Sequence, residues 1–378
     1  MNFIPYGKQF IDDQDIQAVV ETLKSTFLTT GPKIEEFENA LASYCGAKYC
    51  VAVSNGTAAL HLASLVLLNE NDKVLTTPNS FLATANSILY VKAKPIFIDI
   101  VEDGNINLDL CEQILQKDST IKAIYGVSFS GNMLNQKKLK HLKETYNITI
   151  LEDNAHAIGA VYDGIKAGSC TNSDCSIFSF HPIKHITTAE GGAITTNDEN
   201  IYKKLLELRA HGMVKTPEMK PWEYEMQSLG FNYRITDIQC ALGLNQLQKL
   251  DTFLKRRYEI AKKYDESFKN TIIKPLYCYD GKSSYHLYVV KVDFSKSTIT
   301  KEELFIRMKE KNIGLQLHYI PINKQSFYKS LGYGNENTPI MDQYYEECFS
   351  LPIYYSLSND EQKYVIKSIK ELIKNENS

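Results

Sequence analysis

The sequence has no long hydrophobic run, and this absence argues against a protein with transmembrane helices. No apolar stretch reaches the roughly 18 residues that a transmembrane helix needs. The amino-terminal segment also lacks the basic residues followed by an apolar run that are typical of a secretory signal. We therefore expect a cytoplasmic protein that does not interact with a membrane.

Neither sign of charge is in excess. The chain contains 42 Lys and Arg residues and 45 Asp and Glu residues, which gives a formal net charge of −3. Because no strong positive field surrounds such a chain, we do not expect nucleic acid as a partner. Hydrophobic residues make up 43% and charged residues 23%, as in ordinary globular proteins. The length of 378 residues exceeds that of a single hydrophobic core and predicts two domains.

The cysteines lack the spacing of a metal site or a redox motif. None of the eight cysteines forms a C-x2-C pair, which a zinc ribbon or a dithiol motif would need. We expect no metal site. We interpret the cysteines as small apolar residues that are buried in a protein of a reducing compartment.

What the sequence does contain, between residues 48 and 197, is an alternation of short β-branched runs with longer segments of helical spacing. This alternation predicts a mostly parallel sheet with helices on both faces. The predicted strands are residues 49–53, 73–76, 95–99, 121–127, 148–153, 176–180 and 193–196. The predicted helices between them include residues 58–68, 108–116 and 134–146.

The pattern changes after residue 198, where helical spacing dominates up to residue 272 and includes a long amphipathic stretch at residues 238–250. A strand signal returns at residues 285–292. We predict a large domain over residues 1–250 and a smaller α+β domain over residues 251–378. Residues 214–229, which surround the only tryptophan, Trp222, are predicted to form a mobile loop.

Residues 54–57, Ser-Asn-Gly-Thr, follow the first predicted strand and open the next helix. A glycine lets the backbone approach a ligand closely, and the first N–H groups of a helix attract an anion. A phosphate group fits this position. Taken alone, the tetrapeptide also fits an ordinary helix N-cap.

A carboxylate, Asp153, ends another predicted strand, and His156 follows three residues later. In parallel sheets, ligands bind beyond the carboxyl ends of the strands. A buried carboxylate there needs a cationic or N–H partner, because an unpaired buried charge is costly. A protonated ring nitrogen of a ligand would serve, although an aspartate that caps the following turn is an alternative.

Lys184 lies between two predicted strands, in a segment rich in His, Ser and Thr that ends at Gly191 and Gly192. Most lysines are solvated surface charges. A lysine in a site of this kind can instead have a lowered pKa and form a Schiff base with an aldehyde. The three sites together supply an anion site, a carboxylate for a pyridinium nitrogen and an amine for an aldehyde, which is the set that pyridoxal phosphate (PLP) requires.

With this set of sites, the chain resembles the sugar nucleotide aminotransferases of the DegT/DnrJ/EryC/StrS-like family, from about Tyr6 to the last helix. The resemblance implies the α/β fold of fold-type-I, aspartate-aminotransferase-like PLP transferases. That fold has a mostly parallel seven-stranded sheet between helices, followed by a smaller C-terminal α+β domain. The stretches most similar to family members of pseudaminic acid biosynthesis are residues 178–192, 230–234 and 316–321.

This similarity implies a transaminase that moves an amino group from L-glutamate to C4 of a UDP-linked 4-keto-6-deoxy-N-acetylhexosamine. Carried over by position, it implies PLP as the cofactor and two catalytic residues, Lys184 and Asp153. Lys184 would form the Schiff base with PLP, and Asp153 would pair with the pyridinium nitrogen.

The resemblance also implies a homodimer with shared active sites. The further cofactor-binding residues would be Gly56, Thr57 and Ser179 at the phosphate, Phe81 stacked on the ring, His156 nearby, and Asn232 from the other subunit. The residues for the nucleotide sugar would be Tyr6, Thr26, Phe27, Leu28, Thr29, His318 and Tyr319.

Two departures from the family pattern leave the sugar and the nucleotide open. The relatives of this pathway read Asn-Ser-Ala-Thr at residues 54–57, and some have Lys at the position of Ile320. An aminotransferase for another dTDP-, GDP- or UDP-linked 4-keto sugar is one alternative, and a catalytically inactive PLP-binding regulatory protein is another. A dehydratase of the same family is disfavoured, because such enzymes carry His where this chain has Lys184. An NAD-dependent enzyme is disfavoured because the first strand and helix lack the motif G-x-G-x-x-G.

Overall fold

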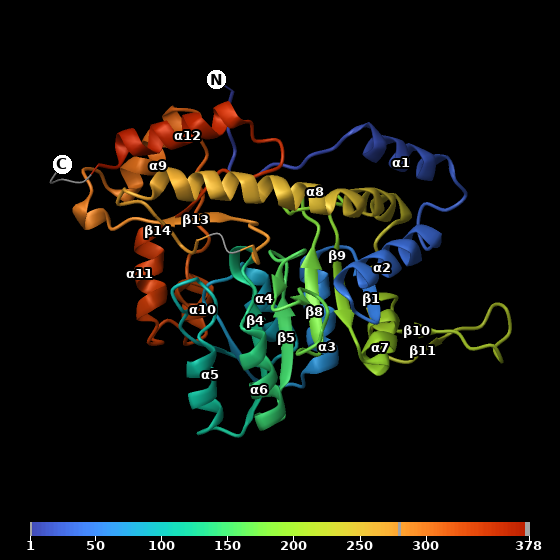
Figure 1. Ribbon diagram of the computed structural model, residues 1–378. Coiled ribbons are helices and arrows are strands. Elements are labelled where there is room, and N and C mark those ends of the chain that lie inside the picture. The colour runs from blue at the N-terminus through green and yellow to red at the C-terminus, as the bar shows by residue number, and fades with distance from the viewer. Residues whose placement is uncertain (1, 279–280, 375–378) are drawn as a thin grey trace.

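The computed structural model describes residues 2–278 and 281–374, and its central element is a seven-stranded sheet (Figure 1). The strand order is β1-β9-β8-β5-β4-β2-β3. The strands are β1 (Tyr49–Val53), β2 (Lys73–Thr76), β3 (Lys94–Phe97), β4 (Ile121–Val127), β5 (Thr149–Asp153), β8 (Cys175–Ser179) and β9 (Gly192–Thr196). In this sheet β9 alone runs antiparallel to its neighbours, so the predicted mostly parallel sheet is confirmed.

Helices cover both faces of the sheet. Successive side chains of a strand point to opposite faces, and the strands carry apolar side chains on both, so each face packs against helices. Val51 and Val53 of β1 face a core formed with α3 (Gly56–Leu67), α4 (Leu82–Tyr90) and α7 (Glu199–Arg209). Cys50 and Ala52 face the opposite core, which includes α2 and α8. The other helices of this domain are α1 (Asp13–Lys24), α2 (Pro32–Cys45), α5 (Leu108–Leu115) and α6 (Gln136–Tyr146), with a 3-10 turn, η1 (Phe129–Gly131), and a two-strand pair, β6 (Val161–Tyr162) with β7 (Ile165–Lys166).

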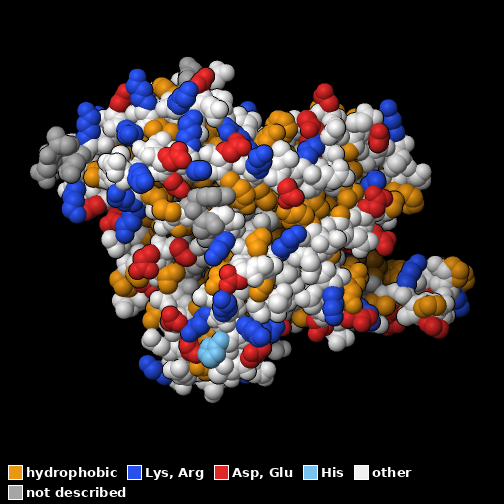
Figure 2. All heavy atoms as spheres, in the orientation of Figure 1, with side chains coloured by type: hydrophobic (Ala, Val, Ile, Leu, Met, Phe, Trp, Pro, Cys, Tyr) orange, Lys and Arg blue, Asp and Glu red, His pale blue; other side chains and the backbone are white. Residues whose placement is uncertain are grey.

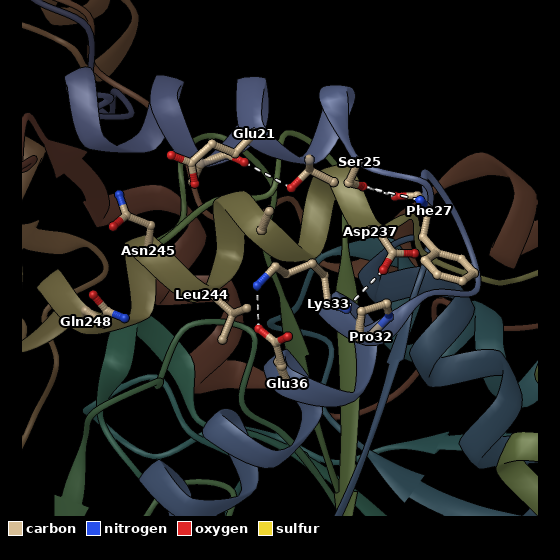
Figure 3. Close-up of a pocket in the computed structure, with 13 residues that line it drawn as sticks. Glu21, Ser25, Phe27, Pro32, Lys33, Glu36, Asp237, Leu244, Asn245 and Gln248 are labelled. Atoms are coloured by element: carbon tan, nitrogen blue, oxygen red, sulfur yellow. Dashed lines mark hydrogen bonds and ion pairs between the residues drawn. The ribbon is translucent and has the colours of Figure 1, made fainter.

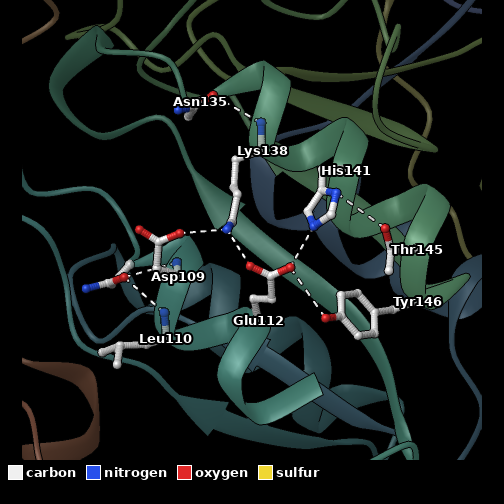
Figure 4. Close-up of polar contacts among 9 residues, drawn as sticks. Asp109, Leu110, Glu112, Asn135, Lys138, His141, Thr145 and Tyr146 are labelled. Atoms are coloured by element: carbon white, nitrogen blue, oxygen red, sulfur yellow. Dashed lines mark hydrogen bonds and ion pairs between the residues drawn. The ribbon is translucent and has the colours of Figure 1, made fainter. Parts of the chain in front are cut away.

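A polar cluster joins α5 to α6 on the outer surface (Figure 4). Glu112 of α5 lies 2.5 Å from Lys138 Nζ and 2.6 Å from His141 Nε2. Lys138 also contacts Asp109 at 2.6 Å. Hydrogen bonds from Lys138 and His141 lower the pKa of Glu112 to about 2. The cluster fixes two helices that together cover the sheet beside β4 and β5.

Helix α8 (Asp237–Phe268) contributes to two hydrophobic cores, one beside the large sheet and one in the C-terminal part. It begins at a capping box between Thr236 and Gln239. Leu250 packs in the core beside the large sheet, whereas Tyr264 packs in the core of the C-terminal part. The helix predicted at residues 238–250 therefore continues to Phe268, and residue 250 lies inside it. The division into residues 1–250 and 251–378 stays a prediction.

The C-terminal part is built around a three-stranded antiparallel sheet of β12 (Lys274–Pro275), β13 (Tyr288–Lys291) and β14 (Cys348–Leu351). Ile4, near the amino terminus, joins its core and pairs with Ile313. The remaining helices are α9 (Lys301–Glu310), α10 (Ser326–Ser330), α11 (Pro339–Glu347) and α12 (Asn359–Leu372), with two 3-10 turns, η2 (Phe294–Lys296) and η3 (Ile322–Lys324).

A hairpin formed by β10 (Met213–Val214) and β11 (Glu225–Met226) projects from the large domain, at the right of Figure 1. Residues 214–229, which were predicted to form a loop, contain most of this hairpin. Its apolar side chains are exposed, with 74% of the Trp222 surface and 78% of the Leu229 surface open to solvent. Figure 2 shows hydrophobic atoms on this arm. The arm therefore presents apolar side chains away from the rest of the chain.

The cysteines are all free, and every one except Cys278 is buried. The prediction that all eight are buried is therefore wrong for Cys278, which follows β12 outside the core elements. Burial raises the pKa of the Cys45 and Cys175 thiols, so these side chains stay protonated and apolar. Within residues 2–278 and 281–374, no helix is both long and apolar enough to cross a membrane.

Gly131 in η1 marks a close approach between the two parts of the chain. Its backbone φ is +102°, in the left-handed region, and its carbonyl accepts a hydrogen bond of 3.0 Å from Ser284 N. A Cβ atom at this position would lie 2.6 Å from Ser284 Oγ and 2.8 Å from Tyr285 N. Only glycine allows the segment before β13 to pack this closely.

Replacing this glycine tests the close approach. We expect Gly131→Ala to lower the free energy of unfolding by about 2–4 kcal/mol, because overpacking adds to the cost of the left-handed backbone. The matched control is Gly164→Ala, where φ is +83° and no atom lies within 4 Å of the added Cβ. The control should cost only about 1–2 kcal/mol. Urea unfolding of both variants gives the comparison, and equal costs would contradict the packing argument.

Candidate active site

A cavity of about 810 Å³ opens at the carboxyl ends of β1, β5 and β8. Because these strands are parallel, their last residues meet at one edge of the sheet. Ten residues predicted from the sequence line this cavity: Tyr6, Gly56, Thr57, Phe81, Asp153, His156, Ser179, Lys184, His318 and Tyr319. The structure thus brings together residues that are distant in the sequence.

One end of the cavity is formed by the amino terminus of α3. Asn55 caps the helix, since its Oδ1 accepts a hydrogen bond of 2.8 Å from Ala58 N. Within the described chain, the amides of Gly56 and Thr57 make no hydrogen bond, so both remain available to an anion. A Cβ atom on Gly56 would lie 2.9 Å from Ser179 Cβ. Glycine therefore lets the helix amino terminus and the Ser179 side chain form one anion cradle.

Asp153 lies at the end of β5 with 5% of its surface exposed. Its Oδ2 accepts a hydrogen bond of 2.6 Å from Thr84 Oγ1, and its Oδ1 accepts one of 3.1 Å from Ala155 N. Burial raises the pKa of this carboxyl group despite these two hydrogen bonds. A cationic N–H group in the cavity would stabilise the ionised form.

Lys184 lies in the turn between β8 and β9, where Thr188 N donates to Phe180 O and closes the segment. The lysine is half-buried, because part of its side chain faces the cavity. Removal from water lowers its pKa to about 8, and the nearby Asp153 carboxylate opposes this shift. A substantial fraction of the amine is therefore neutral near physiological pH, which is the form that attacks a carbonyl group.

Aromatic and imidazole rings form the opposite wall. Tyr319 Oη lies 3.1 Å from His156 Nε2, and the His318 ring packs 5.3 Å from the Tyr6 ring. His318 Nδ1 lies 2.8 Å from Ser350 Oγ, so this ring is also held in place. Phe81 is 60% exposed at the cavity, with its ring 6.3 Å from that of Tyr319. These rings offer flat surfaces to a planar ligand.

Five predicted residues lie elsewhere in the single chain. Asn232 is exposed and forms an isolated bridge with Ala210. The exposed residues Thr26, Phe27, Leu28 and Thr29 lie in the loop between α1 and α2. Phe27 lines a different pocket, of about 390 Å³, between α1, α2 and α8 (Figure 3). One chain therefore does not gather these five residues with the others, and their roles stay predictions.

Sequence reasoning missed several residues of the site. Thr84 was not predicted because it carries no motif, although its position three residues after Phe81 places it one helical turn along α4. Ser80 Oγ lies 2.7 Å from Thr84 Oγ1 and extends the hydrogen bonds to Asp153. Tyr233 and Gln316 also line the cavity. Tyr233 and Gln316 lie within residues 230–234 and 316–321, two of the stretches that resemble the family. This resemblance was the signal that could have identified them.

The similarity to known proteins extends over nearly the whole chain. Residues 9–370 match the model of the DegT/DnrJ/EryC1/StrS aminotransferase family. A Campylobacter jejuni protein named UDP-4-amino-4,6-dideoxy-N-acetyl-beta-L-altrosamine transaminase is 43% identical over 377 residues, which cover 98% of each chain. Helicobacter pylori PseC, an aminotransferase involved in the biosynthesis of pseudoaminic acid, has a TM-score of 0.92 at 32% identity, covering 98% of this chain and 99% of PseC. The PLP-form of Spr1654 from Streptococcus pneumoniae has a TM-score of 0.89 at 30% identity, with 98% of both chains covered.

The lowered pKa of Lys184 can be measured in protein without bound cofactor. We expect competitive labelling with acetic anhydride to be half-maximal near pH 8 at Lys184. At Lys137, whose pKa is raised by the Asp163 carboxylate, labelling should need a higher pH. In Asp153→Asn the pKa of Lys184 should fall further, because a negative charge that favours the ammonium form is lost. Mass spectrometry gives the labelled fractions. If Lys184 is labelled only over the same pH range as Lys137, or at a higher pH, the result contradicts a lowered pKa of Lys184.

Proposed function

The chain belongs to the DegT/DnrJ/EryC1/StrS aminotransferase family, and on this basis we propose that it is a PLP-dependent transaminase that acts on a nucleotide sugar. It moves the amino group of L-glutamate to C4 of a UDP-linked 4-keto-6-deoxy-N-acetylhexosamine. The product is UDP-4-amino-4,6-dideoxy-N-acetyl-β-L-altrosamine, in pseudaminic acid biosynthesis. One observation carries the chemistry: a helix amino terminus, a buried carboxylate and a lysine of lowered pKa line a single cavity.

The residues present fit PLP. The cradle beside Gly56, which a Cβ atom would fill, suits the phosphate with the Thr57 amide and the Ser179 hydroxyl. Asp153 suits a protonated ring nitrogen, and Phe81 suits the face of the ring. When bound, PLP supplies an electron sink for the carbon atom that gains or loses the amino group.

The protein's own side chains then carry the proton transfers. With PLP bound, Lys184 would hold the aldehyde of the cofactor, and its amine, once free, would take the proton from the α-carbon of glutamate. In the second half-reaction Lys184 delivers a proton to C4 of the sugar, on the face that the lysine occupies. Asp153 would keep the ring nitrogen of the cofactor protonated throughout. Because glutamate leaves as a keto acid before the sugar is aminated, ping-pong kinetics follow.

The named relatives support the choice of sugar. The transaminase from C. jejuni and PseC from H. pylori both match over nearly the whole chain. Tyr6, His318 and Tyr319 line the same cavity, and we assign them to the nucleotide sugar. The cavity volume of about 810 Å³ suits a ligand of this size.

We further propose a homodimer in which each site uses residues of both chains. The support is that Asn232 and residues 26–29 are exposed and lie outside the cavity of their own chain. The exposed apolar hairpin next to Asn232 gives a surface that a second copy can cover (Figure 2). In this arrangement Asn232 of one chain reaches the phosphate site of the other.

Loss of Lys184 tests the reaction. We expect Lys184→Ala to lose at least about 1,000-fold in amino transfer from glutamate, because both the amine and the proton carrier are removed. Lys140→Ala, an exposed change outside the cavity, should keep full activity. The assay uses a panel of UDP-, dTDP- and GDP-linked 4-keto sugars, with NMR of the product at C4. Turnover by the Lys184 variant would overturn the mechanism, and preference for a dTDP- or GDP-sugar would overturn the proposed substrate alone.

Mixed dimers test the shared site. Lys184→Ala and Asn232→Asp should each be nearly inactive, the second because a carboxylate repels the phosphate. After subunit exchange, a one-to-one mixture should recover roughly a quarter of the sites, since half of the dimers carry one complete site. The control mixture of Lys184→Ala with Asp153→Asn should recover nothing, because those two residues come from the same chain. Equal behaviour of the two mixtures would refute sharing.

A further inference from the structure

Behind the cavity wall lies a group of three buried imidazoles, and only one of them lines the cavity. His156, His185 and His286 are each 4–5% exposed. The ring of His286 lies 4.4 Å from that of His156 and 5.4 Å from that of His185, measured between centroids. His156 follows Asp153 by three residues, and His185 follows Lys184 directly. His286 comes from the segment before β13, in the other part of the molecule, and contacts the neighbours of both proposed catalytic residues.

The segment that carries His286 is held by hydrogen bonds to both of these neighbours. Ser284 Oγ donates to the carbonyl oxygen of His156 at 3.0 Å. The ring Nε2–H of His185 donates to the carbonyl oxygen of Ser284, also at 3.0 Å. Ser284 N and Leu287 N donate to the carbonyl oxygens of Gly131 and Ser130. The backbone around His286 is therefore fixed relative to the cavity wall.

A buried arginine completes this arrangement. Arg257 Nη1 donates to the carbonyl oxygens of Tyr285 and His286, at 3.0 and 3.2 Å, and to that of Ile353. Arg257 is 3% exposed and forms no ion pair with a described residue. Burial lowers the pKa of His286, and the positive charges of Lys184 and Arg257 add to this shift. The His286 imidazole is accordingly neutral.

The link between His286 and its neighbour His156 is a ring contact. The Nδ1 atoms of His286 and His156 make no hydrogen bond within the described chain, so none joins the two imidazoles there. Their ring centroids lie 4.4 Å apart at an interplanar angle of 37°. Because both rings are buried and closely packed, this contact restricts the orientations that the His156 ring can take.

We propose that His286 is a positioning residue, whose ring fixes the orientation of His156 and thereby of the Tyr319 hydroxyl that His156 Nε2 contacts. The effect on catalysis rests on the proposed function, but the contact between the rings does not. His286 itself touches neither the cavity nor a reacting atom. The C-terminal part of the chain thus sets the geometry of a ring that the large domain supplies.

Two substitutions separate positioning from packing. His286→Phe keeps a flat ring in contact with His156, whereas His286→Ala removes the ring. We expect His286→Ala to lower kcat about tenfold with KM nearly unchanged, and to weaken binding of added PLP to the cofactor-free protein. We expect His286→Phe to keep most of both. A purely structural role would lower the free energy of unfolding of His286→Ala but leave kcat of the folded enzyme unchanged, and that result would overturn the proposal.

A measurement without cofactor keeps the inference separate from the proposed function. The protein is labelled with ¹³Cε1-histidine, and the His156 signal is assigned from its loss in His156→Gln. We expect this signal to shift in His286→Ala and, if that variant does not fold, in Ser284→Ala, which removes the donor to the His156 carbonyl. An unchanged His156 signal refutes the inference, even if the enzyme is a transaminase. A shifted signal in a protein that binds no PLP would support the inference and overturn the proposed function instead.

Discussion

The site depends on one constraint, namely that parallel strands of a sheet all end at the same edge. β5 ends in Asp153 and β8 in Ser179, the loop after β1 leads into α3, and the turn that carries Lys184 leaves β8 at this edge. The return strand β9 pairs antiparallel with both β8 and β1, which fixes the turn and the loop before α3 side by side. Gly192 in β9 allows this approach, since a Cβ atom there would lie 2.5 Å from the Asn55 backbone.

Removal from water gives these groups their chemical character. The same burial lowers the pKa of Lys184, raises that of Asp153, and keeps the surrounding imidazoles neutral. The net charge of −3 provides no general attraction for an anionic nucleotide sugar. Positive potential is instead local, at the amino terminus of α3. A ligand that brings its own cationic ring nitrogen and its own phosphate complements both ends of the cavity.

The large sheet could be predicted from the sequence because each strand is a short apolar run bounded by turn residues, and all seven lie within two residues of their predicted ends. The site residues at strand ends followed from that sheet, whereas Phe81, His318 and Tyr319 depended on the resemblance to a family. Thr84 and His286 could not be predicted, since each acts through a contact between segments that are distant in sequence. The continuity of α8 across residue 250 was missed for a related reason, because the apolar stripe of the helix changes partner from one core to the other without an interruption of the helix.

The continuity of α8 has a mechanical consequence. A helix of 32 residues embedded in two cores behaves as a rigid strut, since bending it would break backbone hydrogen bonds that neither core can replace. We therefore expect no hinge within this helix near residue 250. Cutting the chain there would divide the helix and uncover apolar side chains, because Phe253 and Leu254 pack in the core beside the large sheet although they follow residue 250.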